Sequence, residues 1–196
     1  MSTEADSHTE RDEEHLAPLT VRFMHALERR RAGQVDRAAD DLRAILRVEP
    51  RLAEPHIELA SIHLAMEQPE PGVEHAREAV RLLESGSRWN EDLPEDVLKS
   101  LAYNLLGEAL RKVADQDAVV FGEPDRWKAL MEEARQSFRT AAALDPDNQH
   151  ASWAAFGFGP EPEEAPETED AAGADIPALD LVGLVALHEG DGASES

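Results

Sequence analysis

The residues of this 196-residue chain with the most obvious chemistry are its eight histidines and 42 acidic side chains. His56 and His63 lie seven residues apart, and Glu67 follows four residues after His63. On one helix this spacing separates the two imidazoles by two turns, which is too far for both to bind one metal ion without bending the helix. The chain has no His-Glu-x-x-His motif either. We therefore predict no metal site and no cofactor.

Sequence motifs for catalysis are also missing. The chain has no cysteine, which excludes thiolate nucleophiles, disulfides and cysteine-ligated metal sites. There is no Gly-x-Ser-x-Gly motif, and Gly157 and Gly159 precede a proline-rich stretch rather than a helix. Acid pairs are abundant, but outside a cleft that shifts their pKa values they only solvate a surface. We predict a protein that is not an enzyme; a metal-binding or enzymatic helical protein is the alternative from another functional class.

The distribution of charge narrows the range of partners. The formal net charge is −23, and residues 159–196 hold eleven acids and no base. Such a chain is repelled by phosphate backbones and by anionic lipid surfaces, so we predict no nucleic-acid partner and no membrane insertion. The N-terminus lacks the basic start and apolar core of a signal peptide. These features, with the absence of cysteine, favour a cytoplasmic location.

The elements that position these side chains are predicted from hydrophobic periodicity. From Thr20 to about Ala155, apolar residues recur at helical spacing, and glycines and prolines mark the boundaries. The expected helices cover about residues 20–32, 35–49, 57–68, 73–85, 94–115, 124–144 and 147–156. Few aromatic and β-branched residues are present, which also favours an all-α fold.

The rest of the chain divides by composition. Residues 1–17 are predicted to be a disordered acidic tail, residues 18–158 a helical domain, and residues 159–174 a disordered Pro/Glu/Ala linker. Residues 175–189 form an apolar docking segment or short helix, and residues 190–196 a disordered end. Trp153, Phe156 and Phe158 are expected to cap the end of the helical domain.

Residue spacing also reveals an internal repeat. Tyr103-x-x-Leu106-Gly107-x-x-Leu110 is followed by Ala134-x-x-x-Phe138, with Pro146 eight residues further on. This resembles the tetratricopeptide signature W-x2-L-G-x2-Y, then A-x3-F, then P. Weaker copies begin earlier, and they contain Ala26, Gly33, Ala38-x-x-x-Leu42 and Pro50, and then Leu59-Ala60 and Ala76-x-x-x-Val80.

The resemblance covers about residues 19–155 and implies about three stacked helical hairpins. In that family, small residues let paired helices approach closely, and large residues fill the space between the pairs. Two copies exceed the 34-residue family repeat. The second needs four extra residues near 67–72, and the third needs fifteen between Leu110 and Ala134, which we expect to lengthen both helices and their turn.

The resemblance also implies a binding surface. In this family the first helix of each repeat lines a concave groove that holds a segment of a partner protein. The matching positions here are Phe23, Leu27, Arg30, Arg31, Ile57, Glu58, Ser61, Asn104, Glu108, Arg111 and Lys112. Their mixture suits a protein or peptide partner with apolar anchors and some acidic character. In the alternative interpretation, the apolar members are plain core and the charges are a solvated face.

A second docking element is predicted near the C-terminus. The apolar residues that follow the linker include Leu179, Val182, Leu184, Val185 and Leu187. Apolar clusters on flexible tethers commonly order on binding. This segment therefore docks to a partner, folds back into the chain's own groove, or packs permanently as a last helix.

Together these features predict a non-catalytic adaptor or scaffold that binds another protein. The alternative within the binding class is a secretion or assembly chaperone for one substrate protein, because small acidic proteins with three such repeats serve that role in bacterial export.

Overall fold

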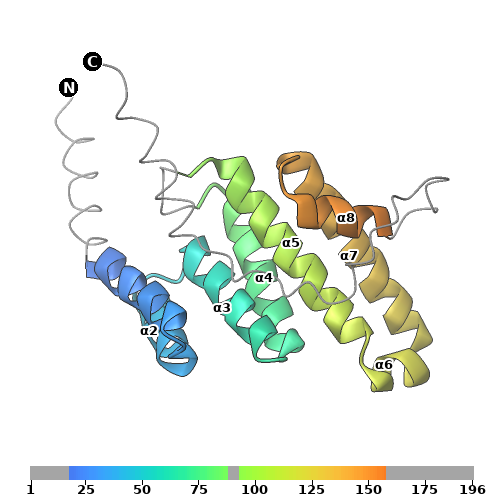
Figure 1. Cartoon of the computed structure of the whole chain (residues 1–196), viewed down its shortest axis with the longest axis horizontal. Helices are drawn as coiled ribbons and strands as arrows, with labels where there is room; N and C mark the ends of the chain where they lie inside the picture. Colours follow the sequence, from blue (N-terminus) through green and yellow to red (C-terminus); the bar gives the residue numbers. More distant parts are fainter. Residues whose placement is uncertain (1–17, 88–92, 158–196) are drawn as a thin grey trace, which may run out of the picture.

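The computed structural model describes residues 18–87 and 93–157, and these residues contain helices and no strand (Figure 1). The prediction of an all-α fold is confirmed for this part of the chain. The predicted N-terminal tail, the linker, the apolar docking segment and Phe158 lie outside the described residues.

A first helix occupies residues 18–31. It is followed by α2 (Val35–Val48), α3 (Ala53–Ala65), α4 (Pro69–Glu84), α5 (Glu95–Ala114), α6 (Asp117–Gly122), α7 (Pro124–Leu144) and α8 (Gln149–Gly157). Two details differ from the sequence prediction. Pro69 begins α4, where its missing N–H costs nothing, rather than merely following α3. The extra residues of the third copy accompany two long helices, α5 with 20 residues and α7 with 21, and the turn between them contains the separate short helix α6.

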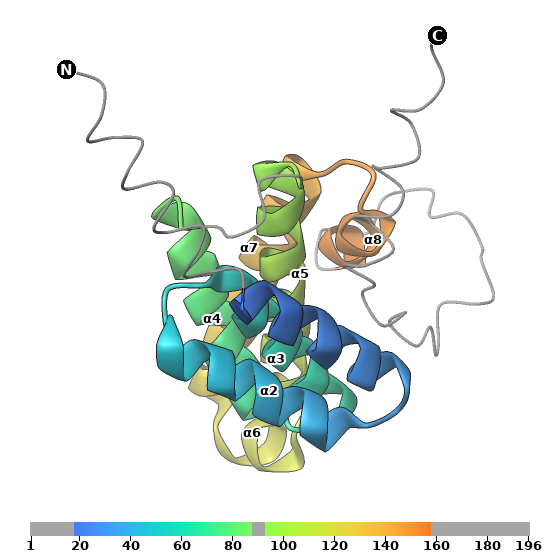
Figure 2. The same cartoon turned by 90° about the vertical axis from the view of Figure 1, so that its left-hand side faces the viewer.

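Most helices pack against their neighbours in chain order, but α5 packs mainly against α7 and only slightly against α6, and both α3 and α8 also contact α5 (Figures 1 and 2). Outer helices such as α2 bury a single stripe, which consists of Ala38, Ala39, Leu42 and Ile45. In contrast, 11 of the 13 residues of α3 are buried, so this helix is enclosed on nearly every side. The helix α5 is enclosed in a similar way over its central turns. The two helices that carry most of the predicted binding residues therefore lie at the centre of the fold.

Left-handed residues end three of the helices. Gly33 and Gly86 have φ values of 75° and 77°, which glycine adopts without steric cost. At the first of these turns, the Gln34 N–H donates to the Arg29 carbonyl at 2.8 Å, which satisfies a helix-end acceptor. Glu67 makes the same kind of turn after α3 with φ 57°, although it carries a side chain. These sharp ends bring each following helix back along the one before it.

Small and large residues meet between α5 and α7 at the positions of the repeat signature. Phe138 is 0% exposed, and its ring lies directly over Gly107. A Cβ atom at position 107 would approach ring carbons of Phe138 to 2.9 Å, closer than packed carbon atoms come. The hydrogen at Gly107 is therefore what lets these two long helices pack this closely.

The last helix is attached by a polar junction. Asn148 caps α8, since its Oδ1 accepts the Ala151 N–H at 3.0 Å. Its Nδ2 donates to Ser100 Oγ on α5, and that hydroxyl donates to the Ala141 carbonyl on α7 at 2.9 Å. Ala151 is fully buried, whereas Trp153 is 53% exposed. Small residues therefore seal this end of the core, and Trp153 does not act as the cap that the sequence suggested.

Candidate functional site

The predicted binding residues of the first helix and α3 meet in one buried polar contact. Arg30 forms an ion pair with Glu58, whose side chain is 1% exposed, and its second guanidinium nitrogen donates to Ser61 Oγ at 2.7 Å. Arg30 itself is 14% exposed. A buried carboxylate needs a partner of this kind because an uncompensated charge in the interior is very costly. These three residues therefore connect the first helix to α3.

A second polar group lies on α5. Glu108 is 4% exposed, and its Oε1 accepts a hydrogen bond from Arg111 at 2.7 Å. Its other oxygen lies 3.8 Å from Nε2 of His150 on α8, a distance that allows an ion pair but exceeds a hydrogen bond. Asn104, one turn earlier on α5, is also 4% exposed. Its Oδ1 is buried and accepts no hydrogen bond within the described part of the chain.

Electrostatics keep Glu108 charged. Burial alone would raise the pKa of this carboxyl, but His150 and Arg111 outweigh burial and hold the pKa below its usual value. The side chain is therefore ionised at neutral pH. It is a buried anion whose second oxygen has only a distant partner.

The eleven predicted binding residues have three kinds of environment. Buried members are Leu27, Ile57, Glu58, Ser61, Asn104 and Glu108. Partly exposed members are Phe23, Arg30, Arg111 and Lys112, and Arg31 is exposed. The structure brings Arg30, Glu58 and Ser61 together, and likewise Glu108 with Arg111. The sequence did not reveal that two of the four bases, Arg30 and Arg111, are paired with acids of the same set.

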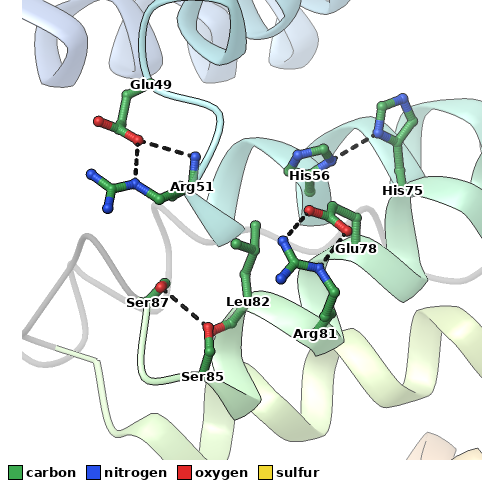
Figure 3. A network of polar contacts seen from close by, with 9 residues as sticks. All are labelled: Glu49, Arg51, His56, His75, Glu78, Arg81, Leu82, Ser85 and Ser87. Atoms are coloured by element: carbon green, nitrogen blue, oxygen red, sulfur yellow. Dashed lines mark hydrogen bonds and ion pairs between the residues drawn. The ribbon is translucent and has the colours of Figure 1, made fainter.

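A histidine cluster between α3 and α4 also escaped the sequence prediction. His75 of α4 contacts both imidazoles of α3. Its Nδ1 is 3.0 Å from Nδ1 of His56 (Figure 3), and its ring stacks on His63 at a centroid distance of 5.5 Å. His63 in turn contacts Gln68 Oε1 at 2.9 Å. The two-turn gap between His56 and His63 is thus filled by a third ring from the neighbouring helix. Only the packing of the two helices could reveal this.

The cluster disfavours protonation. Burial lowers the pKa of His75 to about 4, with further lowering by the neighbouring His56, His63 and Arg43. Burial also lowers the pKa of His56, against an opposing effect of Glu78 and with a further lowering by Arg81. Glu78 and Arg81 are themselves paired at 2.5 Å beside the cluster (Figure 3). His56 and His75 are therefore neutral at physiological pH, and a hydrogen bond joins their rings.

The rest of the described surface carries one pocket and one apolar patch of note. In residues 18–87 and 93–157, no group of three His, Asp or Glu side chains is positioned to hold a metal ion. A shallow pocket of about 230 Å³ lies between the first helix and α2, and its lining consists of Pro18, Val21, Arg22, His25, Arg29 and Asp41. Both of its arginines pair with Asp41, the one acid in its lining. An exposed apolar tip consists of Val120, Phe121 and Trp127, and Phe121 is 83% exposed.

Comparison with known proteins leaves the family open. No family model matches the chain, and no curated protein matches it either. Among the helices described, none combines the length and the apolar character that crossing a membrane requires.

Proposed function

We propose that this chain is a non-catalytic adaptor or scaffold, built from three tetratricopeptide-like helix pairs, that binds a segment of another protein in the cytoplasm. The pairs are the first helix with α2, α3 with α4, and α5 with α7, and α8 closes the stack. The close contact of α5 and α7 at Gly107 supports this interpretation, because the family signature expects a small residue at this position to let paired helices approach closely.

The observation that carries the proposal is the polar character of the central helices. Helices enclosed on nearly every side are expected to be apolar, yet α3 buries Glu58 and Ser61, and α5 buries Asn104 and Glu108. All four lie at positions that the resemblance assigns to the binding face. Arg30 satisfies Glu58 and Ser61, but Asn104 Oδ1 has no donor among the described residues and Glu108 Oε2 has only a distant one. Because buried polar groups reduce stability unless they are satisfied, the two residues of α5 favour recognition over packing.

Site-specific cross-linking tests this proposal. A photoreactive amino acid replaces Lys112, beside the row on α5, and, in a matched variant, the exposed Lys128 on α7. We expect a partner captured from the native cytoplasm to cross-link from position 112 and not from position 128. Equal cross-linking from both positions, or no partner recovered by the tagged full chain, would contradict the proposal.

The apolar segment with Leu179, Val182, Leu184, Val185 and Leu187 is proposed as the second docking element. A chain without residues 172–196 distinguishes the three possible roles. Loss of capture at an unchanged melting temperature supports docking to a partner. A large fall in melting temperature shows a permanently packed helix instead, and tighter capture shows self-inhibition.

A further inference from the structure

The internal pairing of Arg30 and Arg111 changes which kind of partner segment the predicted binding face favours. An acidic partner segment needs available cations on the face. Arg30 is already paired with Glu58 and bonded to Ser61, and Arg111 is already bonded to Glu108. An incoming carboxylate would have to compete with buried carboxylates for these guanidinium groups, which costs charge repulsion in a poorly solvated setting.

Two buried acceptors on α5, in contrast, have unused hydrogen-bonding capacity. Asn104 Oδ1 has no hydrogen-bond donor in the described residues, and the nearest one to Glu108 Oε2 is His150 Nε2 at 3.8 Å. The two residues lie four apart on α5, so their side chains share one face of the helix. A buried acceptor without a donor costs about 1–3 kcal/mol, and a ligand that supplies the donor recovers that cost.

The site is close to solvent. Arg111 and His150 flank Glu108, and their side chains are 43% and 41% exposed. The imidazole nearest to the second carboxylate oxygen is therefore itself accessible from solvent. The ammonium of lysine brings three donors and the guanidinium of arginine brings five, so either satisfies both acceptors at once.

We propose that Asn104 and Glu108 take up a lysine or arginine side chain from an otherwise apolar segment of a partner protein. This inference rests on the proposed function and specifies its partner. Charge complementarity supports it, since the chain carries a net charge of −23. The chain's own residues 159–196 are an unsuitable occupant, because they contain eleven acids and no lysine or arginine.

Three fluorescent peptides with the same leucine and alanine positions test the proposal. Their remaining positions carry lysine, glutamate or glutamine, and binding to the full chain is measured by fluorescence anisotropy at near-physiological salt. We expect the lysine peptide to bind at least about tenfold more tightly than the other two, because only this peptide supplies the missing donors.

Protein variants separate this site from general attraction to an acidic chain. Glu108→Gln removes one buried charge, and Glu132→Gln removes one charge from a side chain that is 65% exposed. We expect the first variant to weaken lysine-peptide binding at least about tenfold and the second to stay within about twofold. Asn104→Leu, which removes the second acceptor without changing the net charge, should weaken it about threefold or more. It serves as the deciding variant if Glu108→Gln does not fold in a circular dichroism melt.

Three results would overturn the inference: no binding of the lysine peptide, equal binding of the lysine and glutamate peptides, or equal loss in Glu108→Gln and Glu132→Gln. The proposed function fails separately. If a captured partner cross-links from position 112 but binds Asn104→Leu as tightly as the unmodified chain, the adaptor role stands and this specificity does not.

Discussion

The second helix pair, α3 with α4, and the third, α5 with α7, are held together by different kinds of contact. Between α3 and α4, three imidazoles lie in contact, and His56 and His75 approach to 3.0 Å. Between α5 and α7, the ring of Phe138 covers Gly107 with no exposed surface. The difference shows that two antiparallel helices can be packed together either through titratable, hydrogen-bonded rings or through an aromatic ring that excludes water. Acid should therefore weaken the packing of α3 against α4, and loss of side-chain volume should weaken the packing of α5 against α7.

Removing the aromatic ring should have the largest effect. Phe138→Ala should lower the free energy of unfolding by about 3–5 kcal/mol, because it leaves a cavity over Gly107. The matched change is Val80→Ala, at the corresponding position of the second pair. Val80 is only partly buried, so we expect a loss of about 1 kcal/mol. Urea denaturation measures both, and equal losses would show that the two pairs are not closed differently.

Adding one carbon to the same contact should have an intermediate effect. Gly107→Ala places a Cβ at 2.9 Å from a ring that is packed on all sides, which costs about 1–3 kcal/mol and outweighs the roughly 1 kcal/mol gain in helix propensity. Gly72→Ala is the control, since its Cβ meets Leu64 at an ordinary 3.5 Å. We expect the control to be neutral or stabilising in thermal melts. A stabilising Gly107→Ala would mean that the ring can move aside.

Acid should weaken the histidine-containing pair. The folded-state pKa of His75 is about 4, against 6.5 for the free side chain, so the unfolded chain binds a proton first as pH falls. His75 therefore does not affect the free energy of unfolding above about pH 7.5 and lowers it as the pH falls from about 6.5 to 4. The loss is on the order of 1–2 kcal/mol after allowance for solvent screening.

The histidine contribution is isolated by comparing variants, because carboxylates also titrate in acid. His75→Gln should flatten the decline in melting temperature between pH 7 and pH 4.5. His25→Gln, which removes an exposed histidine from the first helix, should leave the decline unchanged. An identical decline in all three proteins would show that His75 does not contribute to the acid sensitivity.

Most of the fold was predictable because it depends on local patterns. Apolar periodicity marks the helices, and Gly33, Gly86 and Pro124 lie at real helix boundaries. Spacing alone also identified Gly107 and Phe138 as packing residues, since a glycine and an aromatic residue recur at fixed places in the repeat signature. The short helix α6 was missed because six residues between two long helices carry too little periodicity to distinguish a helix from a turn.

The candidate site was less predictable because it depends on pairing across helices. The resemblance to the repeat family placed Arg30 and Glu58 on one face, but whether they pair with each other depends on how the first helix lies against α3. The position of His75 between two histidines of α3 likewise depends on the register of α4. Such contacts between residues far apart in the chain leave no local signal, so a single sequence indicates the residue types but not their partners.

The Asn148 junction has a consequence for the order in which the chain assembles. Its amide needs the hydroxyl of Ser100, and that hydroxyl is oriented by the Ala141 carbonyl, so the seat of α8 draws on both α5 and α7. The last helix can therefore dock in its final register only after those two helices have come together. Docking of α8 would then be a late kinetic step that reports completion of the third pair.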